Sequence, residues 1–145
     1  MPHSVRRCLF VLMSLMSCAA WCAEDDAPSP PKKDVIGFHL FSQHIPNNNY
    51  NNVNPGIYYR LAEGPVAGIY RNSMRRTSVY AGYMLEYGRF GVTAGAVTGY
   101  TSGAQPLLVP SMALFTYRGV TTRLVFILRI EKRIDSHVLH IVAEI

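Results

Sequence analysis

The chain has 145 residues, a formal net charge of +5 and three cysteines. This length favours a single domain. The charge is modest, and no run of basic residues is interleaved with aromatic ones, which argues against a nucleic-acid-binding protein. The cysteines are Cys8, Cys18 and Cys22. The chain after them therefore offers no disulfide, thiolate metal site or cysteine nucleophile.

Residues 1–23 have the features of a secretory signal. Two arginines precede a short apolar run at 8–20, and small residues follow it. The run is too short and wrongly flanked for a membrane-spanning helix. We therefore expect export, with cleavage near residues 20–23. The sequence before Cys18 loosely resembles a lipoprotein box, so lipidation of that cysteine is the alternative.

The remaining chain divides into a spacer and one domain. Residues 24–34 are polar and Pro-rich, which is typical of a disordered spacer. Residues 35–145 alternate with period 2 between turn signals, which predicts antiparallel β-strands. The expected strands are about 35–45, 55–62, 65–72, 77–87, 90–100, 106–117, 120–130 and 136–145. They predict an all-β fold, an eight-stranded antiparallel up-and-down barrel.

The two faces of the expected strands differ. One face is apolar, with Tyr near strand ends. The other mixes small residues with the charges of Arg60, Glu86, Arg123, Arg129 and Glu131. A soluble barrel or sandwich would bury the apolar face, whereas a membrane barrel would turn it to lipid. Strands of about 9–11 residues, and charges able to pair in a narrow lumen, favour a transmembrane barrel. The C-terminal Ile145 argues against it, because outer-membrane barrels usually end in an aromatic residue.

The first polar group is His39-Leu-Phe-Ser42-Gln-His44, near the end of the first strand. In a regular strand, Ser42 and His44 share a face, while His39 and Ser42 point to opposite faces. A hydroxyl beside an imidazole can form a base-activated nucleophile. The alternative is an ordinary polar strand end beside an Asn-rich turn.

The second polar group lies in the loop after the third strand and contains Asn72, Ser73, Arg75 and Arg76. Asn can orient an imidazole or stabilise an oxyanion, and Ser can attack or donate a proton. The two arginines could contact phosphates. An ordinary polar loop is again the alternative.

The sixth expected strand contains Pro106 and Pro110. Proline cannot donate to a β-ladder, so both would open gaps in the barrel wall. In a membrane barrel such a gap is a lateral doorway for a lipid chain. The alternative is a strand that begins at Leu107 and has a bulge at Pro110. His137 and His140 would face opposite ways on a strand, which argues against a metal site there.

Short motifs from Tyr50 to about Ile127, together with His44, resemble the outer-membrane lipid A palmitoyltransferases in their order and spacing. In chain order they are His44, Tyr50-Asn51, Pro55-Gly56, Gly68-Ile69-Tyr70, Asn72-Ser73, Ala81-Gly82-Tyr83 with Glu86, Thr93-Ala94-Gly95, Pro106 to Pro110 and Tyr117-Arg118-Gly119.

The resemblance implies a small outer-membrane barrel that moves a palmitoyl chain from a phospholipid to lipid A. It implies His44 as base or orienting group, Ser73 as hydroxyl participant and Asn72 as polariser. His39 and Ser42 are the alternative pair. We expect a monomer without metal or cofactor, whose partners are membrane lipids. The residues expected to contact substrate are Arg75, Arg76, Pro106, Pro110, Tyr83 and Glu86.

The chain also departs from this family. The family has Asp where this chain has Asn72, so catalysis could be weakened or lost. Its amphipathic N-terminal helix has no counterpart in residues 24–34. Two other functions therefore stay open. One is a non-enzymatic surface barrel with a binding, exclusion or envelope-protection role. The other is a soluble periplasmic ligand-binding barrel, which Ile145 and a lipidated Cys18 would fit.

Overall fold

The computed structural model describes residues 32–46, 49–127 and 136–145. The expected signal at 1–23 and most of the spacer at 24–34 lie outside the described residues. No helix in the described part of the chain is long and apolar enough to cross a membrane.

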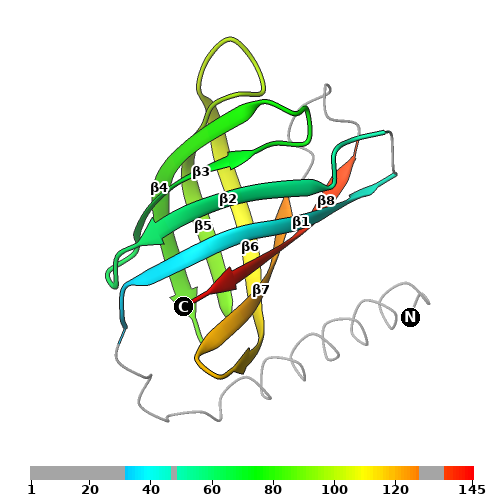
Figure 1. Cartoon of the computed structure of the whole chain (residues 1–145). Helices are drawn as coiled ribbons and strands as arrows, with labels where there is room; N and C mark the ends of the chain where they lie inside the picture. The colour runs from blue at the N-terminus through cyan, green and yellow to red at the C-terminus, as the bar shows by residue number, and fades with distance from the viewer. Residues whose placement is uncertain (1–31, 47–48, 128–135) are drawn as a thin grey trace, which may run out of the picture. The chain divides into compact units, whose positions relative to one another are not determined.

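The described residues form eight β-strands. They are β1 Val35–Ile45, β2 Val53–Arg60, β3 Pro65–Arg71, β4 Thr77–Tyr87, β5 Phe90–Val97, β6 Gln105–Tyr117, β7 Val120–Ile127 and β8 His137–Glu144. Each strand pairs with its neighbours in sequence, and β8 pairs with β1, so the sheet closes into an antiparallel barrel (Figure 1). The all-β, eight-stranded prediction is confirmed. The bounds differ most at β2, which begins two residues before the expected 55, and at β5, which ends at Val97 rather than 100. The expected end of the seventh strand, 128–130, lies outside the described residues.

The two ends of the barrel carry different connections. At one end the turns are short, namely 61–64, 88–89 and 118–119, and the backbones of Ile36 and Ile145 bond to each other there. Arg118 and Gly119 have φ of 50° and 83°, as a tight hairpin turn requires. At the other end lie the longer connections 46–52, 72–76 and 98–104. We call these the short-turn end and the loop end.

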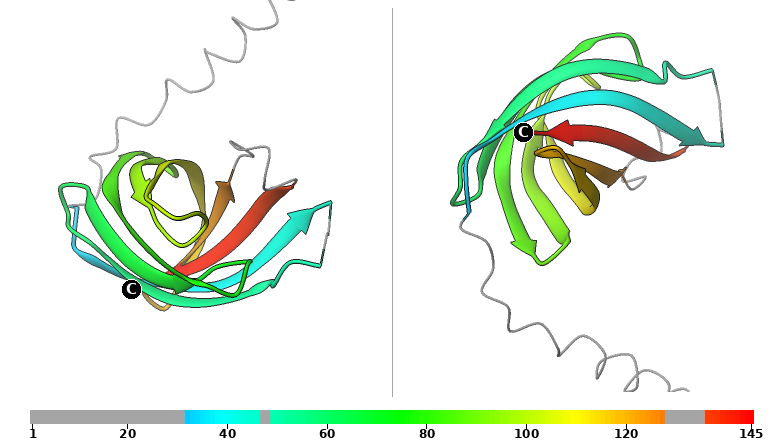
Figure 2. Two further views of the ribbon diagram at one scale, coloured as in Figure 1. Left: turned by 90° about the horizontal axis from the view of Figure 1, so that it is seen from above. Right: turned by 60° about the horizontal axis from the view of Figure 1, so that its bottom comes forward.

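Strand β1 contains a β-bulge between His39 and Phe41. One extra residue in a strand reverses the side-chain alternation beyond it. As a result His39 and Ser42 both point into the lumen, and Ser42 is only 4% exposed. The prediction that these two side chains face opposite ways is therefore wrong. In Figure 2, β1, β2 and β8 lie side by side in one strongly curved wall.

Strand β6 begins at Gln105 and pairs with β5 without interruption through both prolines. The alternative of a strand that begins at Leu107 with a bulge at Pro110 is thus wrong. The register shift of β6 lies against β7, between Ala113 and Phe115. Among the described residues, the β6–β7 pairing starts at Ser111, beyond both prolines. This placement agrees with the missing N–H of proline.

The apolar face of the strands points outward and the mixed face points into the lumen. The most exposed large apolar side chains are Leu85, Tyr87, Phe90, Val53, Phe115 and Tyr117. The lumen holds a cluster of buried apolar residues, namely Tyr58, Val66, Tyr80, Met84, Val97 and Val142. It also holds buried polar and charged side chains, described below.

Candidate active site in the barrel lumen

The lumen contains a cavity of about 390 Å³, within the roughly 300–1,000 Å³ of small-molecule sites. Its apolar wall comes mainly from β3 to β8, through Val66, Met84, Val97, Leu107, Val109, Val125 and Val142. Polar side chains from β1, β8 and the loops line it as well, namely His39, Ser42, His44, Ser73 and His140. The cavity therefore joins an apolar volume to a group of imidazoles and hydroxyls.

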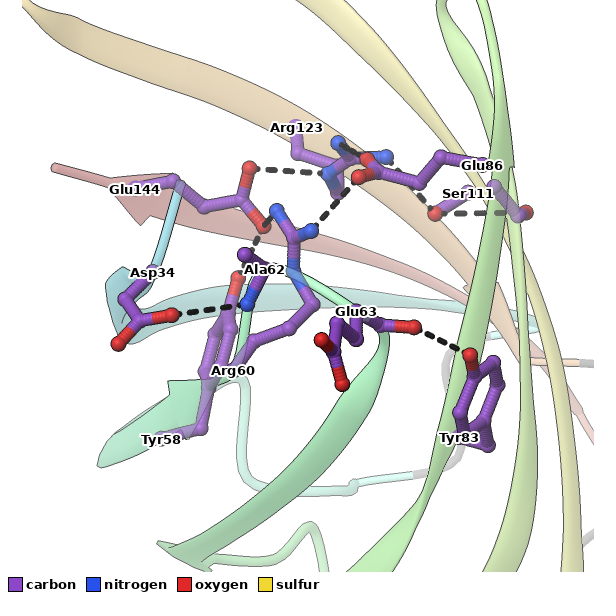
Figure 3. Close-up of polar contacts among 11 residues, drawn as sticks. Asp34, Tyr58, Arg60, Ala62, Glu63, Tyr83, Glu86, Ser111, Arg123 and Glu144 are labelled. Carbon is purple, nitrogen blue, oxygen red and sulfur yellow. Dashed lines mark hydrogen bonds and ion pairs between the residues drawn. The ribbon is translucent and has the colours of Figure 1, made fainter. Parts of the chain in front are cut away.

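Four charged side chains meet near the short-turn end and form an ion-pair network (Figure 3). Arg60 Nη1 lies 2.6 Å from Glu86 Oε2, and its Nη2 lies 3.5 Å from Glu144 Oε1. Arg123 Nε lies 3.2 Å from Glu144 Oε2, and its Nη2 also bonds Glu86. Tyr58 donates to Glu144 over 2.7 Å. Two cations thus balance two anions, as buried charges require.

The network confirms the sequence-based expectation for Arg60, Glu86 and Arg123, which pair inside the barrel. Arg129 and Glu131, expected to pair there as well, lie outside the described residues. Glu144 is the partner that sequence reasoning missed. Its contacts depend on barrel closure, which brings the end of β8 beside β1 and β7.

His44 lies near the loop end and is 1% exposed. Its Nδ1 is 2.9 Å from Asn52 Oδ1, and its ring stacks on Tyr50 with 4.7 Å between ring centroids. Because an amide oxygen can only accept, Nδ1 is the donor, and Nε2 keeps its lone pair. Nε2 has no hydrogen-bond partner among the described residues. His44 therefore has the tautomer and the free nitrogen of a general base.

Asn72 is fully buried, and its amide bonds its own loop, β4 and the 98–104 loop. Its Nδ2 donates to Ser78 Oγ at 2.9 Å and to the Gly99 carbonyl at 3.0 Å. Its Oδ1 accepts from the backbone N–H of Met74 at 2.9 Å and of Arg76 at 3.0 Å. These bonds fill both donors and both acceptor positions of the amide. Asn72 thus holds the 72–76 loop in shape and ties it to β4 and to the 98–104 loop.

The amide that contacts His44 is that of Asn52, not Asn72. The only sequence signal for Asn52 was its place in the Asn-rich turn after the first strand. Ser73 lines the same cavity as His44. The Ser73 carbonyl accepts from the Asn51 N–H at 3.0 Å, which ties the two loops together. The structure therefore brings the predicted His44 and Ser73 to one cavity.

A pair of imidazoles, His39 and His140, lies in the same cavity. Ser42 Oγ is 2.7 Å from His140 Nδ1, and His140 Nε2 is 2.8 Å from His39 Nδ1. His39 Nε2 is 3.1 Å from the Tyr80 hydroxyl. Ser42 was expected to pair with His44, but its hydroxyl meets His140 instead. Sequence reasoning missed this use of His140 because it lies 98 residues from Ser42, and only closure of β8 against β1 places them opposite each other.

The remaining predicted substrate contacts are scattered. Tyr83 is on the outer face and its hydroxyl donates to the Glu63 carbonyl. Glu86 belongs to the ion-pair network rather than to the cavity wall. Arg75 and Arg76 are exposed in the 72–76 loop at the loop end.

The two prolines of β6 also differ in their surroundings. Pro106 lines the cavity, whereas Pro110 is half-buried further along the strand.

In the 98–104 loop, the hydroxyl of Tyr100 lies 2.8 Å from that of Tyr70. Burial raises the pKa of Tyr100 well above its ordinary value of 10.0, so its phenol is a neutral group at the cavity wall. The described residues hold no group of three His, Cys, Asp or Glu side chains suited to a metal ion.

Together these features define a class: a closed eight-stranded antiparallel barrel with an apolar outer face and a lumen cavity that carries imidazoles and hydroxyls. No protein-family model matches the chain, and no curated protein matches it. The resemblance to the lipid A palmitoyltransferases therefore stays a prediction from the motifs alone.

Proposed function

We propose that this protein is an outer-membrane barrel that transfers a fatty acyl chain from a phospholipid to lipid A. The membrane part rests on the outer face. Large apolar side chains such as Ile57, Ile69 and Leu85 are 45–69% exposed around the barrel. Soluble monomers rarely expose a continuous apolar surface, whereas a membrane barrel requires one, with short turns at one end and longer loops at the other.

The membrane proposal is tested at Ile57, which lies within β2 and is 47% exposed. Arginine on the lipid face of a barrel costs roughly 2–4 kcal/mol near the bilayer midplane. On the surface of a soluble barrel the same change stays within about 0.5 kcal/mol. We expect Ile57→Arg to lower the yield of folded barrel in the membrane fraction, and the matched Ile57→Leu to leave it unchanged. Recovery of a stable Ile57→Arg barrel from the soluble periplasmic fraction would favour the soluble alternative.

The reaction rests on one observation, the unpartnered Nε2 of His44, a buried residue of the cavity lining. In the proposed reaction, the acceptor hydroxyl of lipid A gives its proton to His44 Nε2 while its oxygen attacks the acyl ester carbonyl. The ester C–O bond then breaks, and the proton passes to the departing lysophospholipid oxygen. Asn52 stabilises the imidazolium and keeps its ring oriented. The hydroxyl of Ser73 is available to the reacting groups from the same cavity.

Three further features support a lipid substrate. The apolar part of the cavity suits a hydrocarbon chain. Exposed Arg75 and Arg76 suit the phosphates of lipid A or of a phospholipid. Pro106 lies on the cavity wall, and neither it nor Pro110 can donate a hydrogen bond to a neighbouring strand. The segment of β6 that contains both prolines is the proposed path by which a chain enters from the bilayer.

The test is the mass of lipid A from cells with and without the protein. We expect an added acyl mass with the wild type and its loss with His44→Ala combined with Ser73→Ala. Asn52→Ala is expected to reduce the gain by about 10- to 100-fold in initial rate, since it releases the imidazole without removing it. All variants should show the heat-modifiable gel mobility of a folded barrel. No added mass with the wild type, or an unchanged gain with the double variant, would refute the proposed reaction.

A second candidate function is a non-enzymatic surface barrel. It is favoured by Asn72, whose amide serves the loop structure instead of the reacting groups. Here the loop end would bind or exclude a partner. Expression that changes phage or envelope sensitivity while lipid A keeps its mass would support this candidate over acyl transfer.

A further inference from the structure

The hydroxyl of Ser42 has an arrangement that the proposed reaction at His44 does not use. Ser42 is 4% exposed, lines the cavity, and has its Oγ 2.7 Å from His140 Nδ1. The β1 bulge turns both Ser42 and His39 inward, and the register of β1 with β8 sets Ser42 directly opposite His140. Three strand-borne side chains are thus held together at the cavity wall.

The two imidazoles form a chain behind the hydroxyl. His140 Nε2 is 2.8 Å from His39 Nδ1, and His39 Nε2 is 3.1 Å from the Tyr80 hydroxyl. A neutral imidazole donates with one nitrogen and accepts with the other. When His39 donates to Tyr80 and His140 donates to His39, His140 Nδ1 is left to accept from Ser42. The order is then nucleophile, base and orienting group, as in serine hydrolases and acyltransferases.

His39 is well placed to hold His140 in position. Its ring lies 5.0 Å from the Tyr70 ring and 5.2 Å from the Tyr58 ring, centroid to centroid. Packing on these tyrosines restricts the imidazole, so its Nδ1 stays directed at His140. A base held by a packed neighbour keeps the tautomer that its reaction needs.

We propose that Ser42 is a covalent nucleophile, with His140 as its base and His39 as a positioning residue. This inference rests on the proposed acyl transfer. Ser42 Oγ attacks the ester carbonyl of the phospholipid and its proton moves to His140 Nδ1. The ester C–O bond breaks, the lysophospholipid oxygen takes that proton, and the acyl group remains on Ser42 as an ester.

The second half of the reaction uses His44, which lies two residues beyond Ser42 on β1 and shares its lumen face. The acceptor hydroxyl gives its proton to His44 Nε2 and attacks the Ser42 ester. The Ser42–acyl bond breaks, and His44 Nε2 gives the proton to the departing Ser42 Oγ. The acyl chain is then on the acceptor, and both histidines are neutral again. Two bases on one face thereby serve two half-reactions.

The test uses the purified mature protein, folded in detergent, and an alkyl fluorophosphonate as probe. An activated serine displaces fluoride from phosphorus and gains a stable mass, which intact-protein and peptide mass spectrometry locate. We expect labelling of the wild type at Ser42 and none at this position with Ser42→Ala. The matched control is Ser111→Ala, which removes another buried lumen hydroxyl, one that bonds Arg123 rather than an imidazole. It should label as the wild type does.

Two further variants examine the roles of the histidines. His140→Ala should slow labelling by about 10²- to 10⁴-fold, the range for loss of a general base. His39→Gln should slow it less and shift its pH profile, an effect that a purely structural residue would not have. Heat-modifiable gel mobility checks that each variant is folded. A folded wild type without label, or labelling of Ser42→Ala at the wild-type rate on another serine, would overturn the proposal.

The outcome is separable from that of the proposed function. Ser42 labelling without added lipid A mass in cells would refute the transfer to lipid A and leave Ser42 as the nucleophile of another acyl reaction. Added lipid A mass that survives Ser42→Ala would refute the covalent step and leave the direct reaction at His44.

Discussion

Removal of Arg123 tests how far the ion-pair network stabilises the barrel. The side chain is 6% exposed and bonds both Glu86 and Glu144, of which Glu144 is 5% exposed. In Arg123→Met the network of two cations and two anions loses one cation. One carboxylate charge is then left without balance in the lumen. Breaking a buried pair from one side costs about 3–5 kcal/mol.

The magnitude is tested by a double-mutant cycle. Glu144→Gln combined with Arg123→Met removes one charge of each sign and restores neutrality. We expect the double variant to lose less free energy of unfolding than the sum of the single losses by about 1–3 kcal/mol. Such coupling would assign the cost to the unbalanced charge and not to the lost side-chain volume.

The assay is guanidinium unfolding of the barrel in detergent or lipid vesicles. The only tryptophan is Trp21, which precedes the barrel, so far-UV circular dichroism is the suitable signal. With a slope of roughly 4 kcal/mol per molar guanidinium, a loss of about 4 kcal/mol moves the midpoint by about 1 M. A loss below about 1 kcal/mol for Arg123→Met, or simple additivity in the cycle, would refute the reasoning.

Three other changes probe the loop end, the lumen packing and the short-turn end. Asn72→Ala removes four hydrogen bonds and should cost about 4 kcal/mol at about 1 kcal/mol each; an unchanged guanidinium midpoint would contradict the structural role of this amide. Gly37→Ala would place a Cβ 2.0 Å from Tyr58 Cζ, so we expect about 1–3 kcal/mol of destabilisation, and a neutral effect would show that the ring has room to move. Bonds from the Tyr59 hydroxyl and the Ala62 N–H hold the pKa of Asp34 below its ordinary value of 3.8. Their stabilising effect is therefore present at neutral pH and lost as the pH falls through the lowered pKa; Tyr59→Phe should raise the pKa of Asp34 in an NMR titration, and an unmoved value would contradict the contact.

The sequence by itself determined the strands, because period-2 alternation and turn residues are local properties. It also separated the two faces of each strand, and the charges Arg60, Glu86 and Arg123 were correctly expected to pair inside. Alternation alone did not decide which face points outward, since a soluble and a membrane barrel share the same pattern. The outward apolar face became visible only in the closed barrel.

Only some residues of the candidate site could be predicted from the sequence. His44 and Ser73 were identified from their motifs and do line one cavity. The hydrogen-bond partners of the side chains in this site were visible only in the tertiary structure. A bulge in β1 turned His39 inward, which no alternation rule predicts. Closure of β8 on β1 placed His140 against Ser42, 98 residues away. Hydrogen bonding between side chains depends on such long-range register, and local sequence patterns carry no information about it.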